Sequence, residues 1–124
     1  MKNFLSETVE KMINCGYTDL DITFIGTDNG KYECNWKEFK KLSDKKYNSG
    51  LGSVEIPCDL VICFKDGGRF IRCDYDGAEW WREVIPIPNI KSRRKISYLM
   101  GNSYGAFWGL EEMEKEIKES GFDD

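Results

Sequence analysis

Histidine is missing from this chain of 124 residues. Without it, neither a Ser-His-Asp triad nor a Cys-His pair can form, and the side chain that most often acts as a general base near neutral pH is lacking. Carboxylates are plentiful, but no pair of them stands in a pattern that specifies acid–base catalysis. We therefore expect a protein that is not an enzyme.

Paired C-x-x-C motifs are missing as well, although the chain has five cysteines: Cys15, Cys34, Cys58, Cys63 and Cys73. A zinc site without histidine needs four thiolates, which C-x-x-C pairs normally supply. We therefore expect no metal and no other cofactor. Unpaired cysteines pack as small hydrophobic side chains in reducing compartments, so we also expect five free thiols and no disulfide.

Long apolar runs are lacking, and none approaches the roughly 20 residues that a membrane-spanning helix needs. The first residues, MKNFLSETVEK, meet a charge at Glu7 and do not form the apolar stretch of a signal peptide. Hydrophobic residues make up 40% of the chain and charged residues 32%, as is usual for a globular protein. These features predict a cytoplasmic protein with no membrane partner.

Arginine is scarce and unevenly placed, because every arginine lies between residues 69 and 94: Arg69, Arg72, Arg82, Arg93 and Arg94. The planar guanidinium suits bidentate contact with phosphate or carboxylate. The net charge of the chain is −4, which argues against general binding of duplex DNA. The basic run Lys91–Lys95 has two interpretations, a solvated loop or part of a binding segment.

What the chain does have is a strong hairpin pattern at 59–85, DLVICFKDGGRFIRCDYDGAEWWREVI. Two Asp-Gly turn signals separate three runs rich in β-branched and aromatic residues, which is typical of consecutive hairpins. We expect an antiparallel meander with strands at 59–65, 69–75 and 78–85.

The register of this meander decides which side chains share a face. A turn at Gly67-Gly68 gives the expected pairs Phe64–Ile71, Ile62–Cys73 and Leu60–Tyr75. A turn at Asp76-Gly77 gives Trp80–Cys73 and Val84–Arg69. The first set forms an apolar face, so we expect the following residues to be buried: Leu60, Ile62, Phe64, Ile71 and Cys73.

Helices are expected before, between and after the strands. Apolar residues recur at helical spacing over 4–15, a capping box starts a helix at Asn35, and a third helix is expected over 109–120. Alternation over 20–24 predicts a strand with Leu20, Ile22 and Phe24 inward. The pattern predicts one α+β domain over 1–124, a central antiparallel meander sheet flanked by N-terminal, middle and C-terminal helices.

Trp80 and Trp81 are adjacent on a strand and must point to opposite faces, and Arg72 is the expected cross-strand neighbour of Trp81. Two interpretations stay open for this pair, a structural cation–π contact or a binding site. The candidate binding residues are the arginines together with one tryptophan: Arg69, Arg72, Trp81, Arg82, Arg93 and Arg94. We expect Arg72 and Trp81 to be exposed and to contact the partner.

Four motifs resemble those of small phage and prophage proteins of Gram-positive bacteria. They are WKEF at 36–39, YNSGLG at 47–52, DLVI at 59–62 and YDGAEWW at 75–81. The pattern of that group is W-x-E-F, Y-x-x-G-x-G, D-L-V-I and Y-D-G-x-E-W-W in this order. The resemblance implies a small accessory phage protein in the host cytosol, a class rich in inhibitors of host enzymes and of antiviral defence, such as anti-CRISPR proteins.

Two functional hypotheses follow. The first is a non-catalytic inhibitor or binding module that recognises a host protein through an acidic surface and aromatic anchors. The second is a protein that sequesters a nucleotide signal or another small anionic ligand with its arginines and tryptophans. Thermal-shift screening against nucleotides separates the two, because a large shift is expected only for the second.

Overall fold

The structure is a computed structural model, and it describes residues 1–50, 53–97, 99–100 and 109–119. The chain divides into two compact units, Met1–Pro88 and Asn89–Asp124, and each is described by itself. In the described part of the chain, no helix is long and apolar enough to cross a membrane. A single domain over 1–124 stays a prediction.

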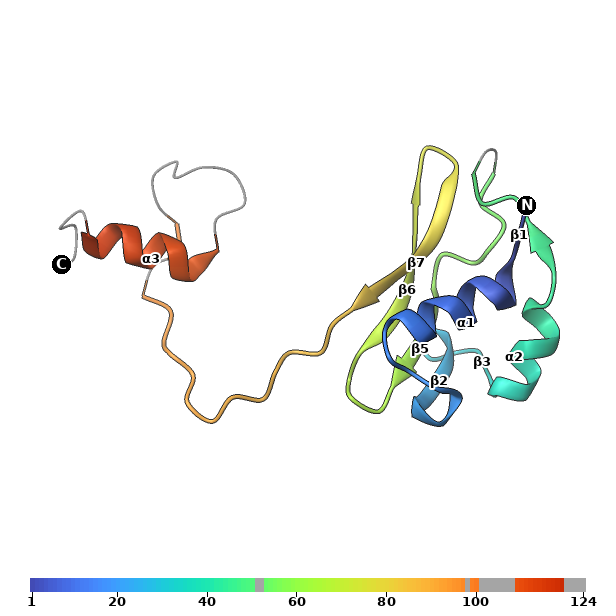
Figure 1. The fold of residues 1–124 in the computed structure, drawn as a ribbon, viewed down its shortest axis with the longest axis horizontal. Coiled ribbons are helices and arrows are strands. Elements are labelled where there is room, and N and C mark those ends of the chain that lie inside the picture. The colour runs from blue at the N-terminus through green and yellow to red at the C-terminus, as the bar shows by residue number, and fades with distance from the viewer. Residues whose placement is uncertain (51–52, 98, 101–108, 120–124) are drawn as a thin grey trace. The chain divides into compact units, whose positions relative to one another are not determined.

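Five antiparallel strands form the main sheet of the first unit, in the order β3-β2-β5-β6-β7 (Figure 1). Their bounds are β2 Ile22–Thr27, β3 Glu33–Cys34, β5 Leu60–Phe64, β6 Arg69–Tyr75 and β7 Ala78–Val84. A two-stranded sheet pairs β1 (Lys2–Asn3) with β4 (Lys46–Tyr47). With helices α1 (Phe4–Asn14) and α2 (Trp36–Ser43), the expected α+β class is confirmed.

Capping residues that the sequence predicts are present in both helices of the first unit. The Asn3 side chain accepts the N–H of Ser6 at 2.9 Å and caps α1. At the other end, Gly16 has a φ of +79° and Tyr17 donates its N–H to the carbonyl of Met12 at 2.8 Å, which ends the helix in a Schellman motif. The capping box expected at the start of α2 is also present.

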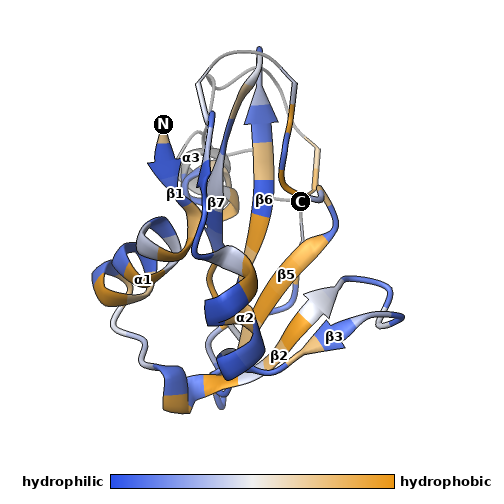
Figure 2. Ribbon diagram, turned by 90° about the vertical axis from the view of Figure 1, so that its right-hand side faces the viewer, coloured by the Kyte–Doolittle hydropathy of each residue, from blue (hydrophilic) through white to orange (hydrophobic). Residues whose placement is uncertain are grey.

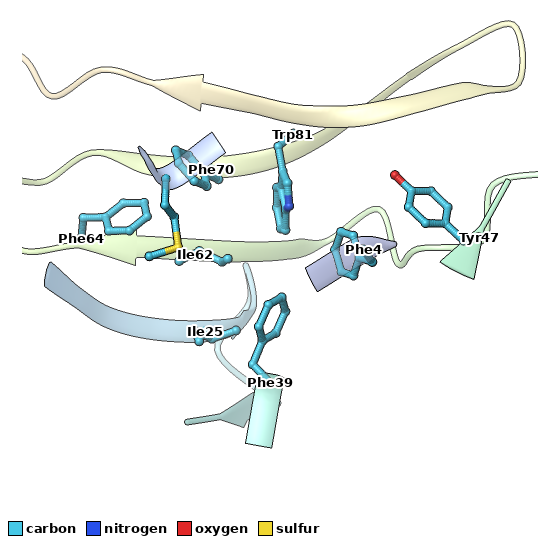
Figure 3. Packing of buried hydrophobic residues seen from close by; sticks show 9 residues of the cluster. Phe4, Ile25, Phe39, Tyr47, Ile62, Phe64, Phe70 and Trp81 are labelled. Atoms are coloured by element: carbon cyan, nitrogen blue, oxygen red, sulfur yellow. The ribbon is translucent and has the colours of Figure 1, made fainter. Parts of the chain in front are cut away.

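The core lies between the helices and one face of the sheet. Figure 3 shows the side chains of α1 and α2, Phe4 and Phe39, pointing toward the strands, where Ile62 lies at the centre with none of its surface exposed. The buried hydrophobic cluster consists of Phe4, Met12, Ile25, Phe39, Tyr47, Ile62, Phe64, Phe70 and Trp81. Most of these side chains are aromatic, so the helices pack on the sheet mainly through ring contacts.

Ile62→Ala is expected to lower the free energy of unfolding by about 2–4 kcal/mol, through lost burial and the cavity left behind. Urea denaturation measures the change. Leu20→Ala is the matched control, because Leu20 is 75% exposed. A similar cost for both variants would contradict the placement of Ile62.

The first hairpin of the meander has a different register from the expected one. Val61 pairs with Ile71, and Ile62 pairs with Phe70 instead of Cys73. The turn is a three-residue loop over 65–67, since the N–H of Phe64 bonds the carbonyl of Gly68. Gly67 supplies the positive φ of +90° that ends this loop. The shift of three residues moves Ile71 and Cys73 out of the core, so their expected burial was wrong.

The second hairpin has the expected register, with Cys73 opposite Trp80 and Arg69 opposite Val84. Its turn has positive φ at both central residues, +51° at Asp76 and +86° at Gly77, as a type I′ turn requires. Asp tolerates this region better than most residues, and Gly has no Cβ to clash.

The expectation for 20–24 was only partly right. Leu20 lies in the 3₁₀ turn Asp19–Asp21 and is 75% exposed, and β2 begins at Ile22. An irregularity between Ile22 and Phe24 breaks the alternation, so Ile25 enters the core and Phe24 turns to the other face.

In the second unit, the expected C-terminal helix is present as α3, Leu110–Glu119. The basic run 91–95 precedes it, and each of its residues is exposed.

Candidate binding face

The face of the main sheet opposite α1 and α2 is open in the described part of Met1–Pro88. Cross-strand pairing places Phe24 beside Cys63, Cys63 beside Arg69, Ile71 beside Arg82 and Cys73 beside Trp80. We call this surface the open face and define it by these residues with Val61 and Val84. Figure 2 shows hydrophobic segments on β2, β5 and β6, which supply most of its apolar residues.

A groove of about 720 Å³ runs along the open face, and its walls include Phe24, Cys63, Arg69 and Ile71. Gly26 leaves room for the Phe24 ring, because a Cβ at Gly26 would come within 2.7 Å of that ring and 2.0 Å of the Tyr32 carbonyl oxygen. Burial raises the pKa of the Cys63 thiol, so this sulfur stays neutral in the groove. The groove therefore combines apolar residues with polar and charged ones, among them Thr27, Asp28 and Arg69.

Trp80 and Arg82 extend the open face along β7. Trp80 is 41% exposed, and Arg69 and Arg82 are exposed as well. Tryptophan and arginine are the residues most enriched where protein partners bind, since both combine an apolar area with a directed polar group. The open face therefore joins an apolar centre to two arginines and an aromatic anchor.

Arg72 and Trp81 are not part of this face, so their expected exposure was wrong. Trp81 is 3% exposed and Arg72 9% exposed, because the true register turns both toward α1. They are cross-strand neighbours as expected, and the Arg72 guanidinium carbon lies 4.8 Å from the centre of the Trp81 ring. The structural interpretation of this pair, a cation–π contact inside the protein, is the correct one.

The buried Arg72 guanidinium holds two carboxylates and a tyrosine. It donates to Glu7 at 3.1 Å, to Glu79 at 3.2 Å and to the Tyr47 hydroxyl at 3.2 Å. Glu79 in turn accepts the backbone N–H groups of Glu55 at 2.8 Å and Ile56 at 3.2 Å. This network ties the segment after β4 to the β6–β7 hairpin and to α1.

Arg93 and Arg94 belong to the second unit, and in the sequence they follow the last strand of the sheet, which ends at Val84. Arg94 approaches Glu111 at 3.9 Å, and both side chains are largely exposed. A contact of this kind between exposed groups contributes little stability. Of the six predicted residues, only Arg69 and Arg82 lie on the open face, while Arg72 and Trp81 meet inside the protein.

Trp80 and Phe24 were missed as candidates. A signal for Trp80 was present, since one of two adjacent tryptophans on a strand must face away from the core. Phe24 carried no such signal, because its orientation depends on the irregularity in β2.

The groups around α1 carry a pH dependence. Burial, then the hydrogen bond to Glu83, raises the pKa of Cys15 from 9.0 to about 11. Burial, aided by hydrogen bonds to Asp66 and Glu7 respectively, raises the pKa values of Tyr17 and Tyr47 from 10.0 to about 12.

Stability is therefore expected to fall as the pH rises from about 9 to about 12. In this range the folded protein keeps protons that the unfolded chain has already lost, so rising pH favours unfolding. Urea denaturation at several alkaline pH values measures the slope. Tyr47→Phe should flatten it above pH 10.0 by removing one of the groups responsible. An unchanged slope would contradict this assignment.

All five cysteines are free thiols in the structure. In the described residues, no three acidic, cysteine or histidine side chains are grouped in a way that could hold a metal ion. No family model, curated protein or solved structure matches this chain.

Proposed function

We propose that this chain is a small phage accessory protein that acts without catalysis, by binding and inhibiting a host protein, and that the open face is its binding surface. The observation that carries the proposal is the composition of this face. Partly exposed apolar residues form its centre, and Trp80, Arg69 and Arg82 surround them. Such a combination is typical of protein interfaces, in which aromatic and arginine anchors supply most of the binding energy.

The resemblance to phage proteins supports the cytosolic host context and the role as an inhibitor of a host enzyme or defence system. The first functional hypothesis named an acidic surface as the site of contact, and this proposal names the open face instead. The open face carries arginines, so it favours an acidic patch on the partner.

The proposal is tested by capture from the cytosolic lysate of a Gram-positive host. The double variant Trp80→Ala, Arg82→Glu is expected to lose the captured protein, because it removes the aromatic anchor and reverses a charge. Tyr32→Ala is the control, since Tyr32 is 74% exposed and is not among the residues that define the open face. Equal capture by all three proteins would rule out the open face.

Sequestration of a nucleotide signal is the second candidate, favoured by Arg69 and the Phe24 ring in the wall of one groove. An arginine fork over such a wall can bind phosphate while a base packs on aromatic carbon. Thermal-shift screening against nucleotides should give a shift that Arg69→Ala removes. No shift with any nucleotide would leave protein binding as the function of the face.

A further inference from the structure

The strand β7 forms one edge of the five-stranded sheet, and β6 is its only neighbour among the described strands. Its seven residues, Ala78–Val84, make it a long edge for a sheet of this size. The other edge strand, β3, has two residues. An exposed edge presents unpaired backbone N–H and C=O groups that can pair with another chain.

The hydrogen bonds of β7 show which of these groups point outward. Ala78 flanks the type I′ turn opposite Tyr75, so its backbone groups pair with β6. Glu79 is the next residue, and its N–H bonds the carbonyl of Ser49 at 2.9 Å, outside the sheet. Alternation then turns the backbone groups of Trp81 and Glu83 outward in the same direction. The segment at Ser49 covers the beginning of the edge and Trp81 is only 3% exposed, so the accessible backbone groups are those of Glu83, which is partly exposed.

The end of β7 adds exposed apolar surface to this edge. Ile85 is 72% exposed and Ile87 is 81% exposed. Pro86 lies against the β5–β6 turn, where a Cβ at Gly68 would be 3.3 Å from its ring. By the same alternation, the backbone groups of residue 86 face β6, as those of Ala78 do. Proline here therefore lacks an N–H that would face β6, and the outward backbone groups of its neighbours are unaffected. Backbone groups and apolar side chains are thus available along the same stretch.

Charge decides which chain this edge can accept. Arg82 points to the open face from the middle of β7, with Arg69 two strand positions away on β6. A second copy of this chain, paired antiparallel around Arg82, would bring two arginines side by side, and like charges directly opposite one another are destabilising. An extended segment with a carboxylate beside Arg82 and an apolar side chain beside Trp80 is stabilised instead.

We infer that the protein recognises its target by strand addition: an extended segment of the partner, with an acidic and an apolar residue two positions apart, pairs with the outer edge of β7. This inference rests on the proposed function and names how the open face would be used. The backbone of Glu83, which is partly exposed, supplies hydrogen bonds, and Trp80 and Arg82 select the side chains.

The test uses a phage-displayed library of short random peptides on the full-length chain. Enriched peptides are expected to carry an acidic and an apolar residue two positions apart and to slow amide hydrogen exchange at Glu83. Glu83→Pro should weaken their binding by at least about tenfold, because it removes an outward N–H without breaking the ladder to β6. Glu83→Ala is the matched control, since it removes the same carboxylate but keeps the N–H.

Peptides that bind Glu83→Pro as well as Glu83→Ala would overturn the inference, and so would a library that yields no enriched peptide. Enrichment of basic peptides would overturn the charge assignment. A dimer in sedimentation experiments that Glu83→Pro dissociates would show that a second copy occupies the edge. If Glu83→Pro still captures a host protein that Trp80→Ala, Arg82→Glu loses, strand addition fails while the proposed function stands.

Discussion

Replacing Arg72 by alanine is expected to lower the free energy of unfolding by about 3–5 kcal/mol, as is usual when one partner of a buried ion pair is removed. Arg72 is the positive group between Glu7 and Glu79, whose side chains are 11% and 1% exposed. Without it, Glu79 keeps a charge inside the protein with only backbone N–H groups to stabilise it. The contacts of the guanidinium with the rings of Phe4 and Trp81, at 5.0 and 4.8 Å, are lost as well.

Arg69→Ala is the matched control for this prediction, because Arg69 lies on the same strand but is exposed. An exposed substitution of this kind usually changes stability by no more than about 0.5 kcal/mol. Urea denaturation of both variants gives the comparison. If Arg72→Ala unfolds at the same urea concentration as Arg69→Ala, the buried network does not hold the fold together.

The difference between the two meander turns shows what the sequence could predict. At Asp76-Gly77 only one pair of adjacent residues readily takes positive φ, so the turn and its register followed from the sequence. At Asp66-Gly67-Gly68 several loops were possible. The Asp66 side chain accepts the N–H of Gly68 at 2.8 Å and the hydroxyl of Tyr17 at 2.8 Å, which helps to fix the three-residue loop over 65–67. A contact with a tyrosine 49 residues away cannot be read from local pattern.

That shift explains why Arg72 and Trp81 were expected on the exposed face. Moving the register by an odd number of residues exchanges the two faces of a strand. The exchange carried Arg72 and Trp81 into the core and Ile71 and Cys73 onto the open face. Arg82 kept its place relative to β6, because the second hairpin was predicted correctly.

The residues that carry the resemblance to phage proteins have mostly structural roles here. Glu38 closes the capping box of α2, Phe39 is buried in the core, and Tyr47 and Glu79 bind Arg72. Tyr75 and Trp80 are exceptions, since these motif residues are 76% and 41% exposed. These motifs therefore describe the scaffold more than the binding surface, which is why they could not identify the working residues.

Trp81→Ala is expected to lower the free energy of unfolding by about 3–5 kcal/mol, because it empties a large space in a closely packed core. The Trp81 ring stacks on Phe4 at 5.6 Å and lies 6.0 Å from Phe70. Its Nε1–H donates to the hydroxyl of Thr8 at 2.8 Å, and this hydroxyl donates to the carbonyl of Phe4 at 2.8 Å. Truncation therefore also leaves a fully buried hydroxyl without its donor.

The adjacent tryptophan provides the control. Trp80→Ala removes a side chain of the same size from the same strand, but one that is 41% exposed and outside the core cluster. Its cost should be about 1 kcal/mol or less, and Trp81→Phe should fall between the two, since it keeps the ring packing and loses a hydrogen bond of about 1 kcal/mol. Urea denaturation of the three variants gives their order. A larger loss for Trp80→Ala than for Trp81→Ala would mean that the two faces of the sheet are assigned the wrong way round, and the open face would then be the interior of the protein.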